Sequence, residues 1–192
     1  MIKIAVVGDI GSGKSHIAKL FGYPVFNADQ EVGNLYNKNR ICFNKLKKLL
    51  PKYINSFPIK KKSIAKAIIN NNYNLKKITE VIHPEIRLKM NRFIKKNRNK
   101  KIIVLDIPLL LENKMNKKND IIVFIDADKI EINKRLKKRN NDNLKIYKRF
   151  KKLQLPVELK KKKSNYIIKN NFKNYSAKKN VKTILNKILL DA

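Results

Sequence analysis

The sequence of this 192-residue chain predicts an α/β fold built on a parallel β-sheet. Short, nearly continuous apolar runs rich in valine and isoleucine recur along the chain, which is typical of strands buried on both faces of a parallel sheet. Segments with helical periodicity separate these runs, and this alternation is the pattern of parallel α/β folds. A cluster of glycines follows the first run and indicates a special turn between the first strand and the first helix.

The N-terminal part contains two predicted strands and a long helical region. Residues 2–7 (IKIAVV) form the first strand, residues 14–21 the first helix, and residues 24–29 (PVFNAD) the second strand. In the helical region, the stretch FNKLKKLL predicts a helix that ends before Pro51. Two sets of apolar residues with helical spacing follow, the first from Leu75 to Ile82 and the second from Ile86 to Phe93. Pro84 lies between them and suits the first turn of a helix better than its interior, so we expect two helices here.

The C-terminal part contains three more predicted strands. Residues 101–112 (KIIVLDIPLLLE) form a strand that runs into a loop, and residues 120–127 (DIIVFIDA) form the next strand. Residues 131–156 are helical and very basic. A short fifth strand, residues 164–171 (SNYIIKNN), precedes a final amphipathic helix, for which Ser176 is the expected N-cap.

The composition indicates which binding partners and which cellular compartment to expect for this chain. The net charge of +33 suits a polyanion partner, but lysine, asparagine and isoleucine are abundant along the whole chain, so we favour a compositional origin. No basic cluster is interleaved with aromatic residues, and we expect no specific nucleic-acid partner. Cys42 is the single cysteine, and no apolar stretch approaches the roughly 20 residues that span a bilayer. We therefore expect a cytoplasmic protein without membrane association, and a monomer.

Residues 8–15 (GDIGSGKS) match the phosphate-binding pattern G-x-x-x-x-G-K-[ST] and contain three of the five glycines of the chain. A triphosphate needs several backbone N–H groups that converge on its oxygens, and side chains on the turn would obstruct that approach. In this pattern the lysine reaches the β- and γ-phosphates and the serine hydroxyl binds Mg²⁺. The predicted nucleotide-binding residues are Gly8, Gly11, Ser12, Gly13, Lys14, Ser15 and His16.

The rest of the sequence narrows the class of nucleotide-binding protein. No glycine follows Gly33, so the D-x-x-G element of guanine-nucleotide switches is missing, and N-K-x-D is missing as well. A small phosphotransferase fits this length. The alternatives are another small-molecule or nucleoside monophosphate kinase and, from a different class, a nucleic-acid-binding protein that exploits the charge.

Six segments resemble the dephospho-coenzyme A kinase family, in its order and spacing and over nearly the whole chain. GDIGSGKS is similar to the family's GGIGSGKS loop, FNAD to its D-A-D, IHPEIR to its H-P-x-[IV]-R and LDIPLLLE to its D-[VI]-P-L-L-x-E. LQLP and SNYIIKNN resemble its glutamine before the last strand and its A-D-x-V-I-x-N-N. The resemblance implies phosphorylation of the ribose 3′-hydroxyl of dephospho-coenzyme A, a small-molecule substrate, with ATP and Mg²⁺ as cofactors.

The resemblance also implies a P-loop kinase fold with three parts. Residues 1–29, 101–139 and 164–192 form the nucleotide-binding core around a five-stranded parallel sheet. Residues 30–100 form a helical acceptor-binding region, and residues 140–163 form a short basic lid.

Four positions depart from the family pattern. Asp9 replaces a glycine, His16 a threonine and Asn27 the first aspartate of D-A-D, and Lys61 stands where the family has an arginine. A lysine keeps the charge of an arginine but loses its bidentate fork.

Two carboxylates are the predicted catalytic and metal-binding groups. The resemblance implies that Asp29 is the catalytic base at the acceptor hydroxyl, with Lys14 opposite it on the phosphates. From the residues alone, Asp29 is equally a candidate helix N-cap. Asp106 ends an apolar strand and is predicted to hold Mg²⁺ together with Ser15, in part through water, although a turn residue at a strand end is the alternative.

The resemblance implies an acceptor site formed by His83, Arg87, Leu110 and Glu112. From the residues alone, His83 is equally a candidate to brace the start of a helix. The alternative for Arg87 and Glu112 is that their side chains face solvent.

Three arginines of the basic region are candidates to clamp the ATP phosphates, because an arginine fork matches a phosphate group. They are Arg135, Arg139 and Arg149, with Arg139 as the first choice. Asn170 is expected to frame the adenine.

Overall fold

The computed structural model describes residues 1–138 and 141–191, and the side chains of residues 1–138 and 147–191. Five parallel strands form one sheet: β1 (Ile2–Gly8), β2 (Val25–Asn27), β3 (Ile102–Asp106), β4 (Asp120–Ala127) and β5 (Tyr166–Asn170). Their order is β2-β3-β1-β4-β5. All five predicted strands are present, and the predicted α/β class is confirmed.

Strand β1 lies at the centre of the sheet, between β3 and β4. Successive residues of a strand point to opposite faces, so Ile4 and Val6 join one apolar cluster and Ala5 and Val7 join another. The chain leaves β1 toward β2, on the side of β3, whereas β4 and β5 lie on the other side. Open α/β sheets bind their ligands at such a point, outside the carboxyl ends of the strands.

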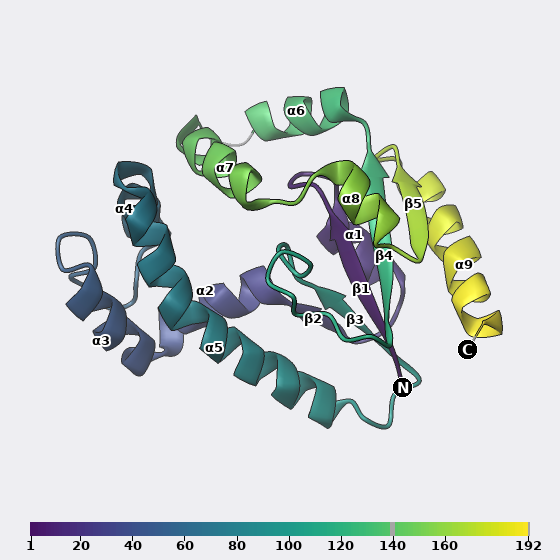
Figure 1. Ribbon diagram of the computed structural model, residues 1–192, viewed down its shortest axis with the longest axis horizontal. Helices are drawn as coiled ribbons and strands as arrows, with labels where there is room; N and C mark the ends of the chain where they lie inside the picture. The colour runs from purple at the N-terminus through teal and green to yellow at the C-terminus, as the bar shows by residue number, and fades with distance from the viewer. Residues whose placement is uncertain (139–140, 192) are drawn as a thin grey trace.

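Helices cover both faces of this sheet (Figure 1). α1 (Lys14–Leu20) and α9 (Asn174–Leu190) pack on one face, where Ile17 and Val181 share a cluster with Val6. The other face carries the long helical region. It consists of α2 (Ala28–Lys38), α3 (Arg40–Leu49), α4 (Lys61–Asn70) and α5 (Asn72–Lys96), whose apolar residues share a cluster with Ala5 and Val7.

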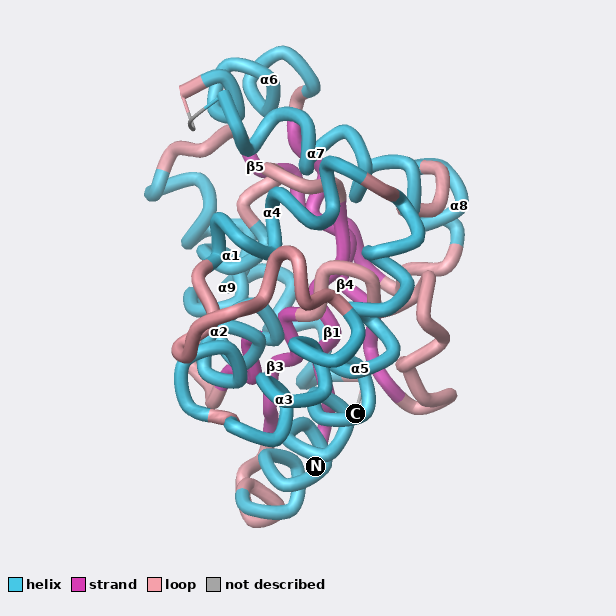
Figure 2. Tube along the Cα trace, turned by 90° about the vertical axis from the view of Figure 1, so that its left-hand side faces the viewer, coloured by secondary structure: helices cyan, strands magenta, loops and turns pink. Residues whose placement is uncertain are grey.

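Three further helices cross the carboxyl end of the sheet, as Figures 1 and 2 show. They are α6 (Lys129–Lys137), α7 (Asn141–Leu153) and α8 (Val157–Lys162). α7 packs against α4, and Arg149 of α7 donates hydrogen bonds to the Ile69 carbonyl oxygen and to Asn72 Oδ1. The basic segment therefore connects the sheet to the long helical region. Among the helices that the structure describes, none combines the length and the apolar character needed to cross a membrane.

The two helices expected around Pro84 are a single helix, α5, with Pro84 in its interior. Proline has no N–H to donate to the Glu80 carbonyl, and this normally ends or bends a helix. The apolar residues before and after Pro84 nevertheless pack on the same cluster, among them Ile82 and Ile86. Continuous packing on both sides of the proline outweighs the missing hydrogen bond, so the expectation of two helices is wrong.

Two predicted ends of elements are also wrong. β2 ends at Asn27, and Asp29 lies in the first turn of α2 rather than at the end of the strand. α9 begins at Asn174, and Ser176, the expected N-cap, lies inside the helix and accepts a hydrogen bond from Asn171 Nδ2.

Candidate active site

The glycine-rich loop follows β1 and ends at Gly13, directly before α1. Gly13 has a φ of +90°, a left-handed conformation that favours glycine. A Cβ atom at this position would stand 2.5 Å from Asn170 Nδ2, so a side chain here would displace the Asn170 amide. Asn170 is buried at the end of β5, and its Nδ2 donates to the Ser12 carbonyl oxygen at 2.8 Å. The hydrogen bond from Asn170 at the end of β5 thus holds the loop in its turn before α1.

Lys14 is buried at the start of α1, and its side chain turns back into the loop. Its Nζ donates to the Gly8 carbonyl oxygen at 3.1 Å and to the Asp9 carbonyl oxygen at 2.8 Å. Burial lowers the pKa of Lys14 to about 8, and the Asp106 carboxylate opposes this shift. The loop therefore holds an ammonium group that its own carbonyl oxygens orient.

Asp106, the last residue of β3, is buried beside the loop. Asn27 is its partner in the register between β2 and β3, and Asn27 Nδ2 donates to Asp106 Oδ2 at 2.6 Å. The same Nδ2 lies 3.5 Å from Ser15 Oγ. Burial raises the pKa of Asp106, while hydrogen bonding with Ser15 and the Lys14 charge oppose the shift. The structure therefore brings together the two residues predicted to hold Mg²⁺, and Asn27, a departure from the family pattern, bridges them.

Asp29 lies in the first turn of α2 and is accessible to solvent. The N-cap of this helix is Asn27, whose Oδ1 accepts from the Gln30 N–H at 2.7 Å, so the interpretation of Asp29 as the cap is wrong. The surrounding protein atoms and the nearby Asp106 carboxylate raise the pKa of Asp29, and Lys14 and Lys61 oppose the rise. Asp29 thus shares one electrostatic neighbourhood with the loop lysine and the Asp106 carboxylate.

The predicted acceptor residues lie on two segments. His83 and Arg87 are one turn apart on α5, and burial together with the Arg87 charge lowers the pKa of His83. Glu112 lies after β3, and its Oε1 accepts from the Leu155 N–H at 3.0 Å. Leu110 has no exposed surface and belongs to the apolar core, so its predicted contact with the acceptor is corrected to a supporting role.

The two arginines of the basic region whose side chains the structure describes, Arg135 and Arg149, lie in different places. The Arg135 guanidinium lies over the Phe172 ring, 4.4 Å from the ring centroid, and Phe172 follows Asn170 with a left-handed φ of 62°. Arg149 contacts the long helical region rather than the loop. Arg139, the first choice for a phosphate clamp, lies outside the described residues.

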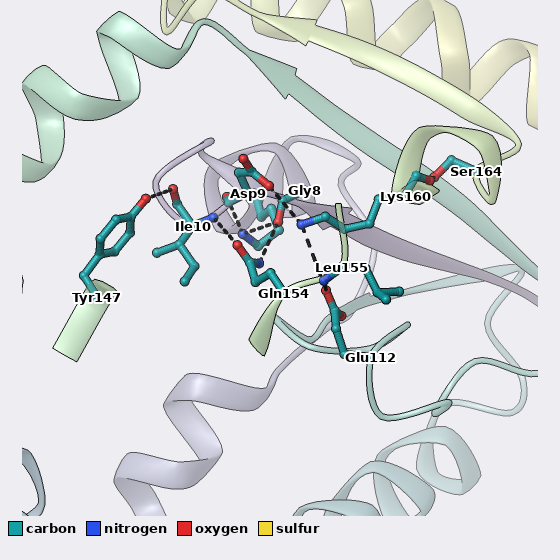
Figure 3. A network of polar contacts seen from close by, with 10 residues as sticks. Gly8, Asp9, Ile10, Glu112, Tyr147, Gln154, Leu155, Lys160 and Ser164 are labelled. Atoms are coloured by element: carbon teal, nitrogen blue, oxygen red, sulfur yellow. Dashed lines mark hydrogen bonds and ion pairs between the residues drawn. The ribbon is translucent and has the colours of Figure 1, made fainter. Parts of the chain in front are cut away.

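Sequence reasoning missed a set of contacts between the basic region and the loop, which Figure 3 shows. Tyr147 Oη donates to the Ile10 carbonyl oxygen at 3.2 Å, and Gln154 Oε1 accepts from the Ile10 N–H at 3.4 Å. Lys160 Nζ lies 2.9 Å from Asp9 Oδ1. The replacement of a glycine by Asp9 was the signal available in the sequence, because a carboxylate in a phosphate-binding loop calls for a cation.

A cleft of about 520 Å³ opens beside the loop, between the ends of β4 and β5 and the helices α6 and α8. Its lining includes Asp9 from the loop, Asp128 before α6, Lys161 of α8 and Asn170 of β5. A ligand held by the loop has room to extend along this cleft.

The oxygen donors near the loop fit Mg²⁺ bound together with phosphates. Such an ion takes one or two protein oxygens, and phosphates and water supply the rest. The Ser15 hydroxyl and the Asp106 carboxylate are suitable donors on adjacent elements. In the described part of the chain, no group of three or more His, Cys, Asp and Glu side chains could hold a metal ion alone.

Comparisons with known proteins bear on the family and the fold of the chain. A family model described as Dephospho-CoA kinase matches residues 2–175. The dephospho-CoA kinase of Wolbachia sp. subsp. Brugia malayi (strain TRS) is 32% identical over an alignment of 194 residues, which covers 98% of this chain and 99% of the relative.

Two solved structures are similar over almost their full length. The crystal structure of TT1252 from Thermus thermophilus has a TM-score of 0.75 and 24% identity, with 97% of each chain covered. The dephospho-CoA kinase from Campylobacter jejuni has a TM-score of 0.65 and 21% identity, with 97% of this chain and 96% of that chain covered. These two structures confirm the fold, and the family match and the sequence identity settle the kinship: the chain belongs to the dephospho-CoA kinase family.

Proposed function

We propose that this chain transfers the γ-phosphoryl group of ATP to the ribose 3′-hydroxyl of dephospho-coenzyme A, the last step of coenzyme A synthesis. The observation that carries the proposal is the meeting of Lys14, Asp106 and Asp29 at the carboxyl ends of neighbouring strands, in a chain of this family. A bond forms between the acceptor oxygen and the γ-phosphorus, and the bond from that phosphorus to the bridging oxygen breaks. The hydroxyl proton leaves, and the products are coenzyme A and ADP.

The loop holds the nucleotide. Its backbone amides and Lys14 bind the β- and γ-phosphates, and the residues from Gly8 to His16 surround them. Asn170 lines the cleft at the ends of β4 and β5, which leaves room for the nucleoside, and Arg135 lies over the ring of Phe172, two residues after Asn170.

Ser15 and Asp106 would hold Mg²⁺, Ser15 through its hydroxyl and Asp106 in part through water. When bound, the ion neutralises charge that develops on the phosphate oxygens. The buried Asp106 keeps its orientation through Asn27, so the donor pair is positioned before the nucleotide arrives.

Asp29 accepts the proton of the acceptor hydroxyl. Its raised pKa makes it a stronger base than an ordinary aspartate. A carboxylate is sufficient because the transition state of phosphoryl transfer is loose, so early proton removal contributes little and positioning contributes most.

The acceptor lies between Asp29 and the helical region of residues 30–100, which serves as the acceptor-binding part beside the core and the lid. Dephospho-coenzyme A carries a diphosphate, and Lys61 and Arg87 supply positive charge for it. His83, whose lowered pKa keeps it neutral near pH 7, serves as a hydrogen-bonding group. The enzyme works as a cytoplasmic monomer without a macromolecular partner.

The test is ADP release measured with a coupled assay on a panel of acceptors. ADP release should require both dephospho-coenzyme A and Mg²⁺, and nucleoside monophosphates should not replace the acceptor. Lys14→Ala should lose nearly all transfer while the protein stays folded. Transfer to another acceptor and none to dephospho-coenzyme A would refute the proposal.

A further inference from the structure

Lys160 is an unusual residue of α8 because its charged end is buried. Of the lysines whose side chains the structure describes, Lys14 and Lys160 are buried, and Lys160 is 1% exposed. An ammonium group removed from water is costly unless a counter-charge lies beside it. The proposed mechanism gives Lys14 a task but none to Lys160, although both lie at the same loop.

The counter-charge of Lys160 comes from the phosphate-binding loop itself. Lys160 Nζ lies 2.9 Å from Asp9 Oδ1 and 4.0 Å from Glu112 Oε1 (Figure 3). The Asp9 carbonyl oxygen accepts from Lys14 Nζ at 2.8 Å and from the Ser12 N–H at 3.1 Å. Asp9 therefore contacts Lys160 through its side chain and Lys14 through its backbone.

A carboxylate in this loop opposes phosphate binding. Asp9 leaves 20% of its side chain exposed, in a loop that binds a polyanion in the proposed function. The charges of Asp9 and Lys160 both act on Lys14, since Asp9 raises the pKa of Lys14 and Lys160 lowers it. Both charges are thus close enough to influence a phosphate group that Lys14 binds.

We propose that the Asp9–Lys160 ion pair sets the affinity of the loop for the phosphates of MgATP. Lys160 acts as a positioning residue: it holds the Asp9 carboxylate at α8 and cancels the negative charge that Asp9 brings to the loop. The inference rests on the proposed nucleotide site and assigns a role to two residues that the transfer mechanism does not use.

The experiment is a charge cycle with four proteins: the wild type, Lys160→Met, Asp9→Asn and the double variant. The dissociation constant of MgATP is measured by calorimetry without acceptor, at low and at physiological salt. Lys160→Met should bind MgATP about tenfold more weakly, because the carboxylate is no longer neutralised. Asp9→Asn should bind it several-fold more tightly, since Lys160 keeps its charge, and the double variant should return to within about threefold of the wild type. These differences should shrink at the higher salt concentration.

The matched control is Lys162→Met, the same change two residues further along α8. Lys162 is exposed to solvent and is not one of the residues that line the cleft, so MgATP affinity should stay close to that of the wild type. Adenosine, which has no phosphates, should bind equally to all proteins. A general loss of structure would weaken adenosine as well, and thermal unfolding checks each variant.

Unchanged MgATP affinity in Lys160→Met would overturn the inference. A double variant as weak as Lys160→Met would also overturn it, because Lys160 would then contact phosphate itself. If Lys160→Met does not fold, Asp9→Asn decides: tighter binding supports the pair, and unchanged or weaker binding refutes it. A wild type that does not bind MgATP removes the proposed function and the inference together, whereas normal wild-type binding with no response in the cycle removes the inference alone.

Discussion

Replacement of Asp29 by asparagine tests the proposed catalytic base. The amide keeps the shape of the side chain and cannot accept a proton near neutral pH. The start of α2 should survive, since Asn27 rather than Asp29 caps the helix and Glu31 keeps a negative charge in the first turn. The loss of one charge there costs about 0.3–1 kcal/mol of stability. A larger loss of stability would contradict this description of the helix start.

The effect on catalysis should be far larger than the effect on stability. General-base assistance contributes about 10²–10⁴-fold, so kcat of Asp29→Asn should fall by that factor while the affinity for MgATP stays close to that of the wild type. Single-turnover measurements with saturating ATP and dephospho-coenzyme A isolate the transfer step. Glu31→Gln is the matched control, because Glu31 lies on the same helix but pairs with Lys89 at 2.8 Å, and its kcat should be unchanged.

The pH dependence gives a second readout of Asp29. Protonation of the base abolishes its function, so wild-type activity should fall as pH decreases through the pKa of Asp29. That pKa is raised above its usual value of 3.8, so the fall begins at a higher pH than for an ordinary aspartate. The variant should lack this dependence. Turnover close to wild type in Asp29→Asn would refute the base assignment, and a collapse of ATP binding would place Asp29 in the nucleotide–metal site instead.

Three further predictions concern other parts of the molecule. Because the pKa of Lys14 is near 8, MgATP binding above pH 8 should take up a proton and weaken by up to about tenfold per pH unit. Calorimetry in buffers of different ionisation enthalpy measures this proton uptake, and no uptake at pH 9 would contradict the lowered pKa of the buried lysine. Phe172→Gly should change the free energy of unfolding by no more than about 1 kcal/mol, because glycine tolerates the left-handed φ of this position. It should raise KM for ATP, because the Arg135 guanidinium loses the ring on which it lies, and an unchanged KM would show that this contact does not position Arg135 for ATP. Pro84→Ala should raise the free energy of unfolding by about 1–3 kcal/mol in urea titrations, since the Glu80 carbonyl regains a donor, and a loss of stability would mean that the proline fits α5 better than alanine.

The sheet was predictable because its signal is local. Each apolar run is short, β-branched and bounded by polar residues, and the loop pattern identifies the first strand–helix turn. The ends of elements depend on side-chain hydrogen bonds that a pattern does not reveal. Asn27 caps α2 through its own side chain, so the helix starts directly after Asn27 and includes Asp29. Pro84 stays inside α5 because of packing against segments distant in the sequence.

The candidate site was predictable where a motif carries it and hidden where a contact crosses the fold. Lys14 follows from the loop pattern, whereas Lys160 is one of 47 Lys and Arg residues and lies 151 positions from its partner Asp9. Composition hides such a residue, since lysine runs are common throughout the chain. Its burial distinguishes it, and burial becomes visible only when α8 is placed over the end of β1.

Helix α7 touches two distant parts of the molecule. Its Tyr147 contacts the peptide of Ile10 in the loop, and Arg149 is bonded to Ile69 and Asn72 between α4 and α5. Because both contacts come from one helix, we expect a ligand that orders the loop to restrain the segment around Ile69 as well. Hydrogen–deuterium exchange would show this as slower exchange of the backbone amides around Ile69 when nucleotide binds at the glycine-rich loop. Binding at the proposed nucleotide site would then change the local opening of the proposed acceptor-binding region.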